Sequence, residues 1–182
     1  KMLPPKIGPV FIVATRSSVS FCVAIFLLSI TGISDFINNI TIVAVVYLIG
    51  SGLTGLVGQL AFVKSLLIGH ISQVFPSTNG LSITFSILGT ILVANQVVTL
   101  GTMAGGFLIL SGVSLLSTSQ VTDVTSPTEK RSRLPTLGLS VITGIAWAIS
   151  VLLQNEVVAE TGPILATAIR ASLMAMICLA IL

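Results

Sequence analysis

Between Lys64 and Asp123 the chain carries no Asp, Glu, Lys or Arg, and His70 is the only titratable side chain in that stretch. A soluble domain draws about 25% of its residues from the charged types. This chain of 182 residues has 7% charged and 54% hydrophobic side chains. Its 8 basic and 5 acidic side chains cannot cover the surface of a soluble fold. The composition therefore predicts a membrane protein and excludes a soluble enzyme, a nucleic-acid-binding protein and a disordered chain.

A helix needs about 20 mostly apolar residues to cross a bilayer, and this length divides the chain into six expected spans. They are residues 7–30, 41–63, 69–94, 98–118, 136–157 and 161–182. A hydrophilic linker at 119–135 separates a block of four spans, residues 1–118, from a block of two spans, residues 136–182. We therefore expect an all-α, multi-pass membrane helix bundle whose solvent is the lipid bilayer.

Two segments of similar sequence, residues 8–18 and 162–172, lie 154 positions apart. They share a Gly-Pro pair, an alanine, an arginine and a serine at matching positions, and the arginines are Arg16 and Arg170. The segments fall in the first and sixth expected spans, and an odd number of membrane crossings reverses the direction of a helix. The pattern thus predicts an inverted-topology repeat, in which a transporter forms its substrate site between two halves. Chance similarity between apolar helices is the alternative.

Several short motifs occur in a characteristic order along the chain. They are Pro9…Ala14-Thr15-Arg16, Ala61-Phe62-Val63-Lys64, Pro76, the run from Gly105 to Val113, and Pro163…Ala168-Ile169-Arg170. Together they resemble the EamA-type domains of the drug/metabolite transporter superfamily, although Gln96 stands where that family usually has Glu. The resemblance implies helices two to seven of a ten-helix protein with two EamA-type halves. It also implies transport of small organic solutes, such as amino acids, metabolites or drugs, across the cell membrane.

Polar and aromatic side chains in or beside the expected spans are candidates for lining a substrate cavity. They are Arg16, Gln59, Lys64, His70, Gln73, Pro76, Ser77, Thr78, Asn79, Trp147, Asn155 and Arg170. An arginine inside a span costs about 2.5–3.5 kcal/mol to insert and is a functional candidate by default. The long side chain can instead reach the membrane interface. Both interpretations stay open for Arg16 and Arg170.

The third expected span holds the densest group of these candidates, from Gln73 to Asn79. Pro76 has no N–H group and predicts a break in the helix, and broken polar backbone occurs at membrane depth only where it is buried or lines a cavity. A packed kink is the alternative. Lys64 can equally mark a helix end, His70 can exchange a proton or cap a helix, and Trp147 can stack on a solute or face lipid.

The sequence contains no Cys/His metal-ligand spacing, no paired carboxylates within a span and no phosphate-binding loop. We therefore expect no enzymatic activity, no metal and no cofactor. The favoured function is secondary transport by alternating access, driven by protons or by solute exchange. The alternative is a membrane scaffold or channel-like subunit that transports nothing, and such a protein needs no inward-facing polar groups.

Overall fold

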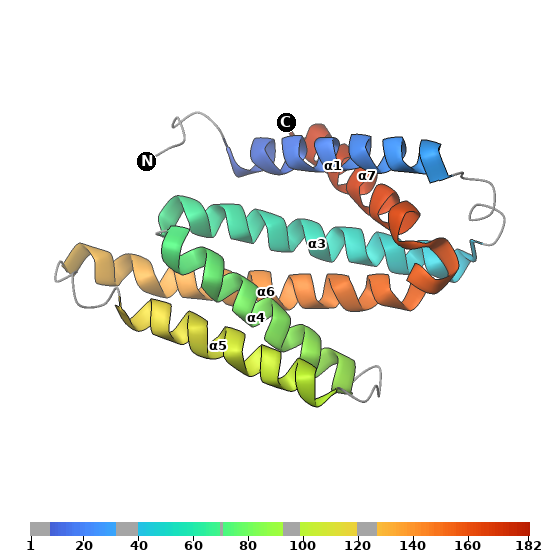
Figure 1. Cartoon of the computed structure of the whole chain (residues 1–182). Coiled ribbons are helices and arrows are strands. Elements are labelled where there is room, and N and C mark those ends of the chain that lie inside the picture. The colour runs from blue at the N-terminus through green and yellow to red at the C-terminus, as the bar shows by residue number, and fades with distance from the viewer. Residues whose placement is uncertain (1–7, 32–39, 70, 93–98, 120–126) are drawn as a thin grey trace. The chain divides into compact units, whose positions relative to one another are not determined.

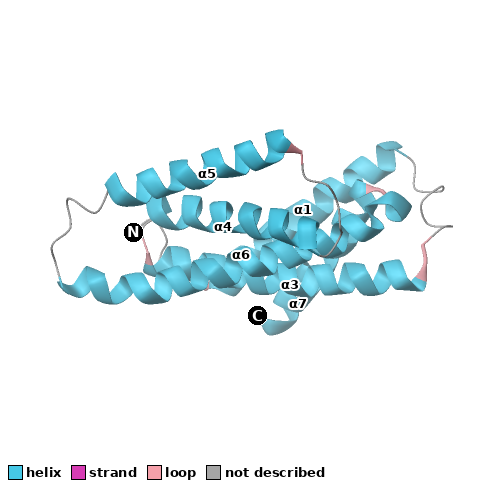
Figure 2. Ribbon diagram, turned by 90° about the horizontal axis from the view of Figure 1, so that it is seen from below, coloured by secondary structure: helices cyan, strands magenta, loops and turns pink. Residues whose placement is uncertain are grey.

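The computed structural model describes residues 8–31, 40–69, 71–92, 99–119 and 127–182. All regular secondary structure in these ranges is α-helical (Figures 1 and 2). The helices are α1 (Pro9–Thr31), α3 (Ile42–Ile68), α4 (Ile71–Leu92), α5 (Leu100–Ser119), α6 (Pro127–Thr161) and α7 (Pro163–Ile181). The predicted all-α fold is confirmed, and helices occupy all six expected positions.

Four of the helices contain a stretch that is long and apolar enough to cross a membrane. The stretches are Pro9–Ile30, Ile42–Ile68, Pro135–Thr161 and Pro163–Ile181. They confirm the first, second, fifth and sixth expected spans. The chain is therefore an integral, multi-pass membrane protein.

The third and fourth expected spans are helices, α4 and α5, but neither is among the four apolar stretches. In α4 the polar residues between Gln73 and Asn79 lower the hydropathy of an otherwise apolar helix. In α5 the apolar stretch found among the described residues is Leu100–Ile109. Four of the six expected spans are thus supported.

The helix α6 begins at Pro127, inside the segment expected to be a hydrophilic linker. Proline suits the first turn of a helix because the N–H group it lacks would be unpaired there. The residues that follow include Glu129, Lys130 and Arg131, all with high helix propensity. The second half of the hydrophilic segment therefore extends α6 ahead of its apolar stretch, while residues 120–126 lie outside the described part of the chain.

The chain folds into two compact units. The first contains Lys1–Leu56 and Ser150–Leu182, and the second contains Val57–Ile149. Both boundaries fall inside long helices, so α3 and α6 each contribute residues to both units. Each unit is consequently built from segments that are far apart in the sequence, and each is described separately below.

In the first unit, α1 packs against α7 in the antiparallel sense. Ala24, in the second half of α1, shares a buried cluster with Ala168, near the start of α7. Ser17, in the first half of α1, places its hydroxyl 4.0 Å from the sulfur of Met174, further along α7. Residue numbers thus fall on one helix as they rise on the other, and Figure 1 shows the same opposed directions. Small residues such as alanine allow this close approach.

The same unit joins α3 to α6 through a buried pair of serines. The Ser51 hydroxyl donates to the carbonyl oxygen of Ser150 at 2.8 Å, and the Ser150 hydroxyl donates to the carbonyl oxygen of Ser51 at 2.7 Å. Both side chains are fully buried. Next to this pair, a buried apolar cluster joins α3, α6 and α7 through Ala44, Leu48, Val157 and Ala166.

A single glycine connects α6 to α7. Gly162 has a φ of 72°, which favours glycine because a side chain would be strained there. Its N–H group donates to the carbonyl oxygen of Val158 at 2.8 Å, and its own carbonyl oxygen accepts the N–H group of Ala166 at 3.2 Å. Pro163 then occupies the first helical position. One residue therefore ends α6 and begins α7.

The second unit packs α4 against α5 and also against α6. Gly144 of α6 lies against Leu81 of α4, where an added Cβ atom would stand 2.8 Å from the Cβ of Leu81. The same added atom would stand 3.2 Å from the backbone of both Leu81 and Ser82. Glycine at this position therefore allows the two helix backbones to approach closely.

Candidate functional site

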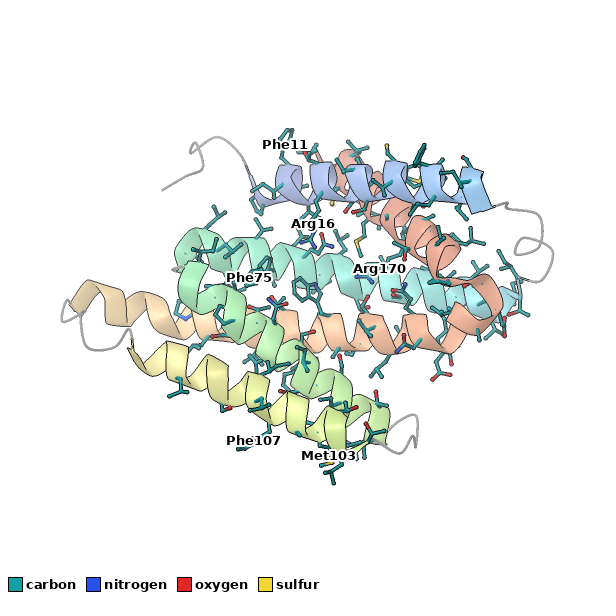
Figure 3. All side chains as sticks on the ribbon, in the orientation of Figure 1. Phe11, Arg16, Phe75, Met103, Phe107 and Arg170 are labelled. Carbon is teal, nitrogen blue, oxygen red and sulfur yellow. The ribbon has the colours of Figure 1, made fainter. Side chains whose placement is uncertain are left out.

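Two groups of residues, one in each unit, bring three of the described candidates into contact with other side chains: Arg16, Arg170 and Trp147. The first, here called the arginine cluster, consists of Arg16 of α1, Gly55 of α3, Gln154 of α6 and Arg170 of α7. Figure 3 shows the two arginine side chains below α1 in the view, on the side of α3. The second, here called the aromatic cluster, consists of Phe62 and Phe75 with Trp147.

Arg170 is half-buried, and its guanidinium group is held by two neighbouring helices. Its Nη1 donates to Oε1 of Gln154 at 2.9 Å. Its Nη2 would be 3.0 Å from a Cβ atom added to Gly55, so the missing side chain of that glycine makes room for the guanidinium group. Met174 occupies the same gap from the next turn of α7. The side chain is therefore positioned by α3 and α6.

Arg16 is exposed on α1 and makes no hydrogen bond to a described residue. Its positive charge lies near enough to Arg170 for the two guanidinium groups to repel each other. Each arginine is the eighth residue of its helix, and each helix begins at the proline of a Gly-Pro pair. The fold thus brings two of the candidate residues together, although they differ in burial.

In the second unit, Trp147 of α6 packs against Phe62 of α3 with ring centroids 5.3 Å apart. Phe75 of α4 lies on Phe62 at 6.2 Å. Gly58 provides space for the indole ring, since an added Cβ atom would stand 2.5 Å from its Cδ1 and 2.8 Å from its Nε1. The half-buried indole ring therefore rests on protein and does not face lipid alone.

The expected break of the helix at Pro76 is wrong, because α4 continues from Ile71 to Leu92 without interruption. Pro76 is the sixth residue of α4, in its second turn and just beyond the four N–H groups at the helix start that have no helical partner. The proline therefore removes a single helical hydrogen bond. Asn79 donates its side-chain N–H to the carbonyl oxygen of Phe75 at 2.8 Å, and this bond stays within the same helix.

Among the described residues of the second unit, two polar atoms are buried with no hydrogen-bond partner in that part of the chain: Oε1 of Gln59 and Oγ1 of Thr78. Thr78 is fully buried, whereas the rest of the Gln59 side chain is half-buried. A buried polar atom that makes no hydrogen bond costs about 1–3 kcal/mol of stability. Among the polar residues of the second unit that are candidates for lining a substrate cavity, these two side chains therefore have the strongest support from the structure.

We expect replacement of Thr78 by valine to leave the free energy of unfolding unchanged or to raise it, because the change removes an unpaired buried hydroxyl group. Thr143 offers a matched control, since it is equally buried but donates to the carbonyl oxygen of Leu139 at 2.8 Å. Thr143→Val should lower stability. Thermal unfolding of both variants in the same detergent checks the contrast, and an equal loss in both would contradict it.

The remaining candidates are not brought into these groups. Lys64 and Asn155 are exposed, Pro76, Ser77 and Asn79 are half-buried, and the side chain of Gln73 and the whole of His70 lie outside the described part of the chain. Arg16, Asn155 and Arg170 belong to the first unit, and the other described candidates belong to the second.

Sequence reasoning missed Gln154, the one hydrogen-bond partner of Arg170 among the described residues, and named its neighbour Asn155. Helical spacing was the available signal. Gln154 lies four residues after the buried Ser150 and three before the buried Val157, which places all three on one face of α6. Asn155 points away from that face and is exposed.

Comparisons of the chain with protein-family models, with curated proteins and with solved structures find no match. The class of protein therefore follows from the fold alone: an all-α membrane protein with several spans.

Proposed function

We propose that this chain forms part of a secondary transporter of small organic solutes, an EamA-type protein in which two inverted halves alternate in opening to the two sides of the membrane. Residues 1–118 would belong to the first half and residues 136–182 to the second. The alternative is a membrane scaffold or channel-like subunit that does not transport by alternating access.

The observation that carries this proposal is the antiparallel packing of α1 on α7. Both helices begin at the proline of a Gly-Pro pair and place an arginine at their eighth position. The glycine carbonyl oxygen accepts the first helical hydrogen bond in both cases, from Ile12 at 3.4 Å and from Ala166 at 3.2 Å. Similar segments that run in opposite directions are expected of an inverted-topology repeat, and substrate sites lie at such repeat interfaces.

Polar groups inside the spans provide a second line of support. Arg170 and Gln154 bond to each other within apolar helices, and buried oxygens of Gln59 and Thr78 have no partner among the described residues. Ionisable and polar groups at membrane depth are costly and usually mark the path of a solute or an ion. A scaffold has no function that requires such groups and would offset the free-energy cost of placing them in the membrane.

Uptake by the full-length protein in proteoliposomes tests the proposal. We expect saturable uptake of at least one labelled organic solute, faster with an imposed pH gradient or with the same solute preloaded inside, because alternating access couples binding to a conformational change. Protein-free liposomes provide the control for leakage. Unsaturable flux would support the channel-like alternative, and no flux from a panel of amino acids, organic acids, amines and sugars would contradict transport.

A further inference from the structure

The arginine cluster contains two positive charges and no described negative charge. Arg16 and Arg170 lie on antiparallel helices that pack directly on each other, and their charges repel. Among the residues that the structure describes, neither guanidinium group is bonded to a carboxylate. Both arginines fall within apolar stretches long enough to span a membrane. Two like charges in such a medium raise each other's energy, so this arrangement is costly unless something neutralises it.

The contacts of Arg170 leave donors available for a ligand. A guanidinium group has five N–H donors, and Arg170 uses Nη1 on the neutral amide of Gln154. That bond orients the group but supplies no countercharge. The absence of a side chain at Gly55 lets Nη2 and the Ser150 hydroxyl approach α3, each 3.0 Å from where a Cβ atom would stand, and the Cε of Met174 fills the rest of that gap. The remaining donors of Arg170, with all those of Arg16, make no hydrogen bond to described residues.

We infer that the arginine cluster binds an anionic group, a carboxylate or a phosphate, between the guanidinium groups of Arg16 and Arg170. Arginine binds both groups through two parallel N–H donors, and such charged hydrogen bonds are about twice as strong as neutral ones. An anion held there would convert a repulsion into two attractions. This inference rests on the proposed transport function and deepens it, because it predicts that the solute is an organic anion.

Binding to the full-length protein in nanodiscs of phosphatidylcholine alone tests the inference without requiring transport. The probes are inorganic phosphate and succinate, with choline and glucose as the cationic and neutral comparisons at constant ionic strength. We expect phosphate or succinate to raise the unfolding temperature in a saturable manner, and choline and glucose to leave it unchanged. If no anion gives a saturable rise, the inference is wrong.

The variants Arg16→Gln and Arg170→Gln should each weaken the apparent affinity for the anion at least about tenfold, the change expected when a charged hydrogen bond is lost. Arg170→Lys should bind with intermediate affinity because it keeps the charge but loses the paired donors. Ser172→Ala is the matched control, since that hydroxyl lies two residues from Arg170 and, among the described residues, bonds only to the carbonyl oxygen of Ile169. It should bind as the unchanged protein does. Unchanged affinity in both arginine variants would overturn the site.

The anionic group can belong to a free solute or to a lipid headgroup, and nanodiscs that contain phosphatidylglycerol separate the two. A lipid-bound site would be stabilised by phosphatidylglycerol in the unchanged protein but not in Arg170→Gln, and added phosphate would then have little further effect. A solute site would respond to phosphate or succinate equally in both membranes. Anion binding without uptake would contradict the transport function and leave the site standing, whereas uptake of cations alone would contradict the site and leave transport standing.

Discussion

Replacing Gly144 with leucine should abolish most of the folded protein. The glycine lets α6 approach α4, and even a single added carbon would meet the Cβ atom of Leu81 at 2.8 Å and backbone atoms of α4 at 3.2 Å. Backbone cannot move aside as the end of a flexible side chain can. Overpacking of a tight contact typically costs about 1–3 kcal/mol and occasionally more, and the larger leucine at a backbone contact belongs at the upper end of that range. The measurement is the yield of monodisperse protein together with its unfolding temperature.

Gly138 provides the matched control on the same helix. It is exposed, and an added Cβ atom would meet nothing within 4 Å. Leucine also has a higher helix propensity than glycine, by somewhat less than about 1 kcal/mol. Gly138→Leu should therefore keep or raise the unfolding temperature. If both variants lost folded protein to the same extent, the close contact between α4 and α6 would be contradicted.

Helix positions were predictable because a membrane span is defined by length and apolarity, both of which can be read along the chain. The spans that contain Arg16 and Arg170 are examples, since the spans expected to start at 7 and 161 are helices that begin at Pro9 and Pro163. The start of α6 at Pro127 was missed because the hydrophilic residues that follow it were interpreted as a loop. The helix propensity of these residues predicts the start of α6 better than their hydropathy does, because this helix extends beyond its apolar stretch.

The break at Pro76 was wrongly predicted for a different reason. The sequence placed Pro76 correctly within the first turns of the third expected span, but a missing N–H group was taken to interrupt the helix. In α4 the helix continues through Pro76, because a proline in the second turn removes only one helical hydrogen bond. The polar residues around Pro76 still include Thr78, whose buried hydroxyl has no hydrogen-bond partner among the described residues.

The candidate site was predictable in its residue types but not in its contacts. Arg170 was identified by being charged within an apolar span, which is a property of the sequence alone. Its bond to Gln154 and its position beside Gly55 depend on which helices touch and on how each is rotated. Neighbouring positions such as Gln154 and Asn155 point about 100° apart on a helix, so composition cannot decide between them.

Replacing Arg16 with glutamine should lower transport at least about tenfold while leaving the folded protein as stable as before, or more stable. A charged arginine within a span costs about 2.5–3.5 kcal/mol to insert, and removing it also relieves the repulsion on Arg170. Arg16 makes no hydrogen bond to a described residue that would be lost. A gain or no change in stability combined with a loss of uptake is the pattern expected of a residue kept for binding.

Arg170→Gln gives the comparison, because that side chain is half-buried and bonded to Gln154 at 2.9 Å. We expect it to lose transport as well, but also to lose some folded protein, since a bond between helices is broken. Uptake and unfolding temperature are measured for both variants at matched protein levels. If Arg16→Gln lost folded protein while the remaining folded fraction transported normally, Arg16 would serve to anchor α1 at the membrane interface, and its role in the arginine cluster would be contradicted.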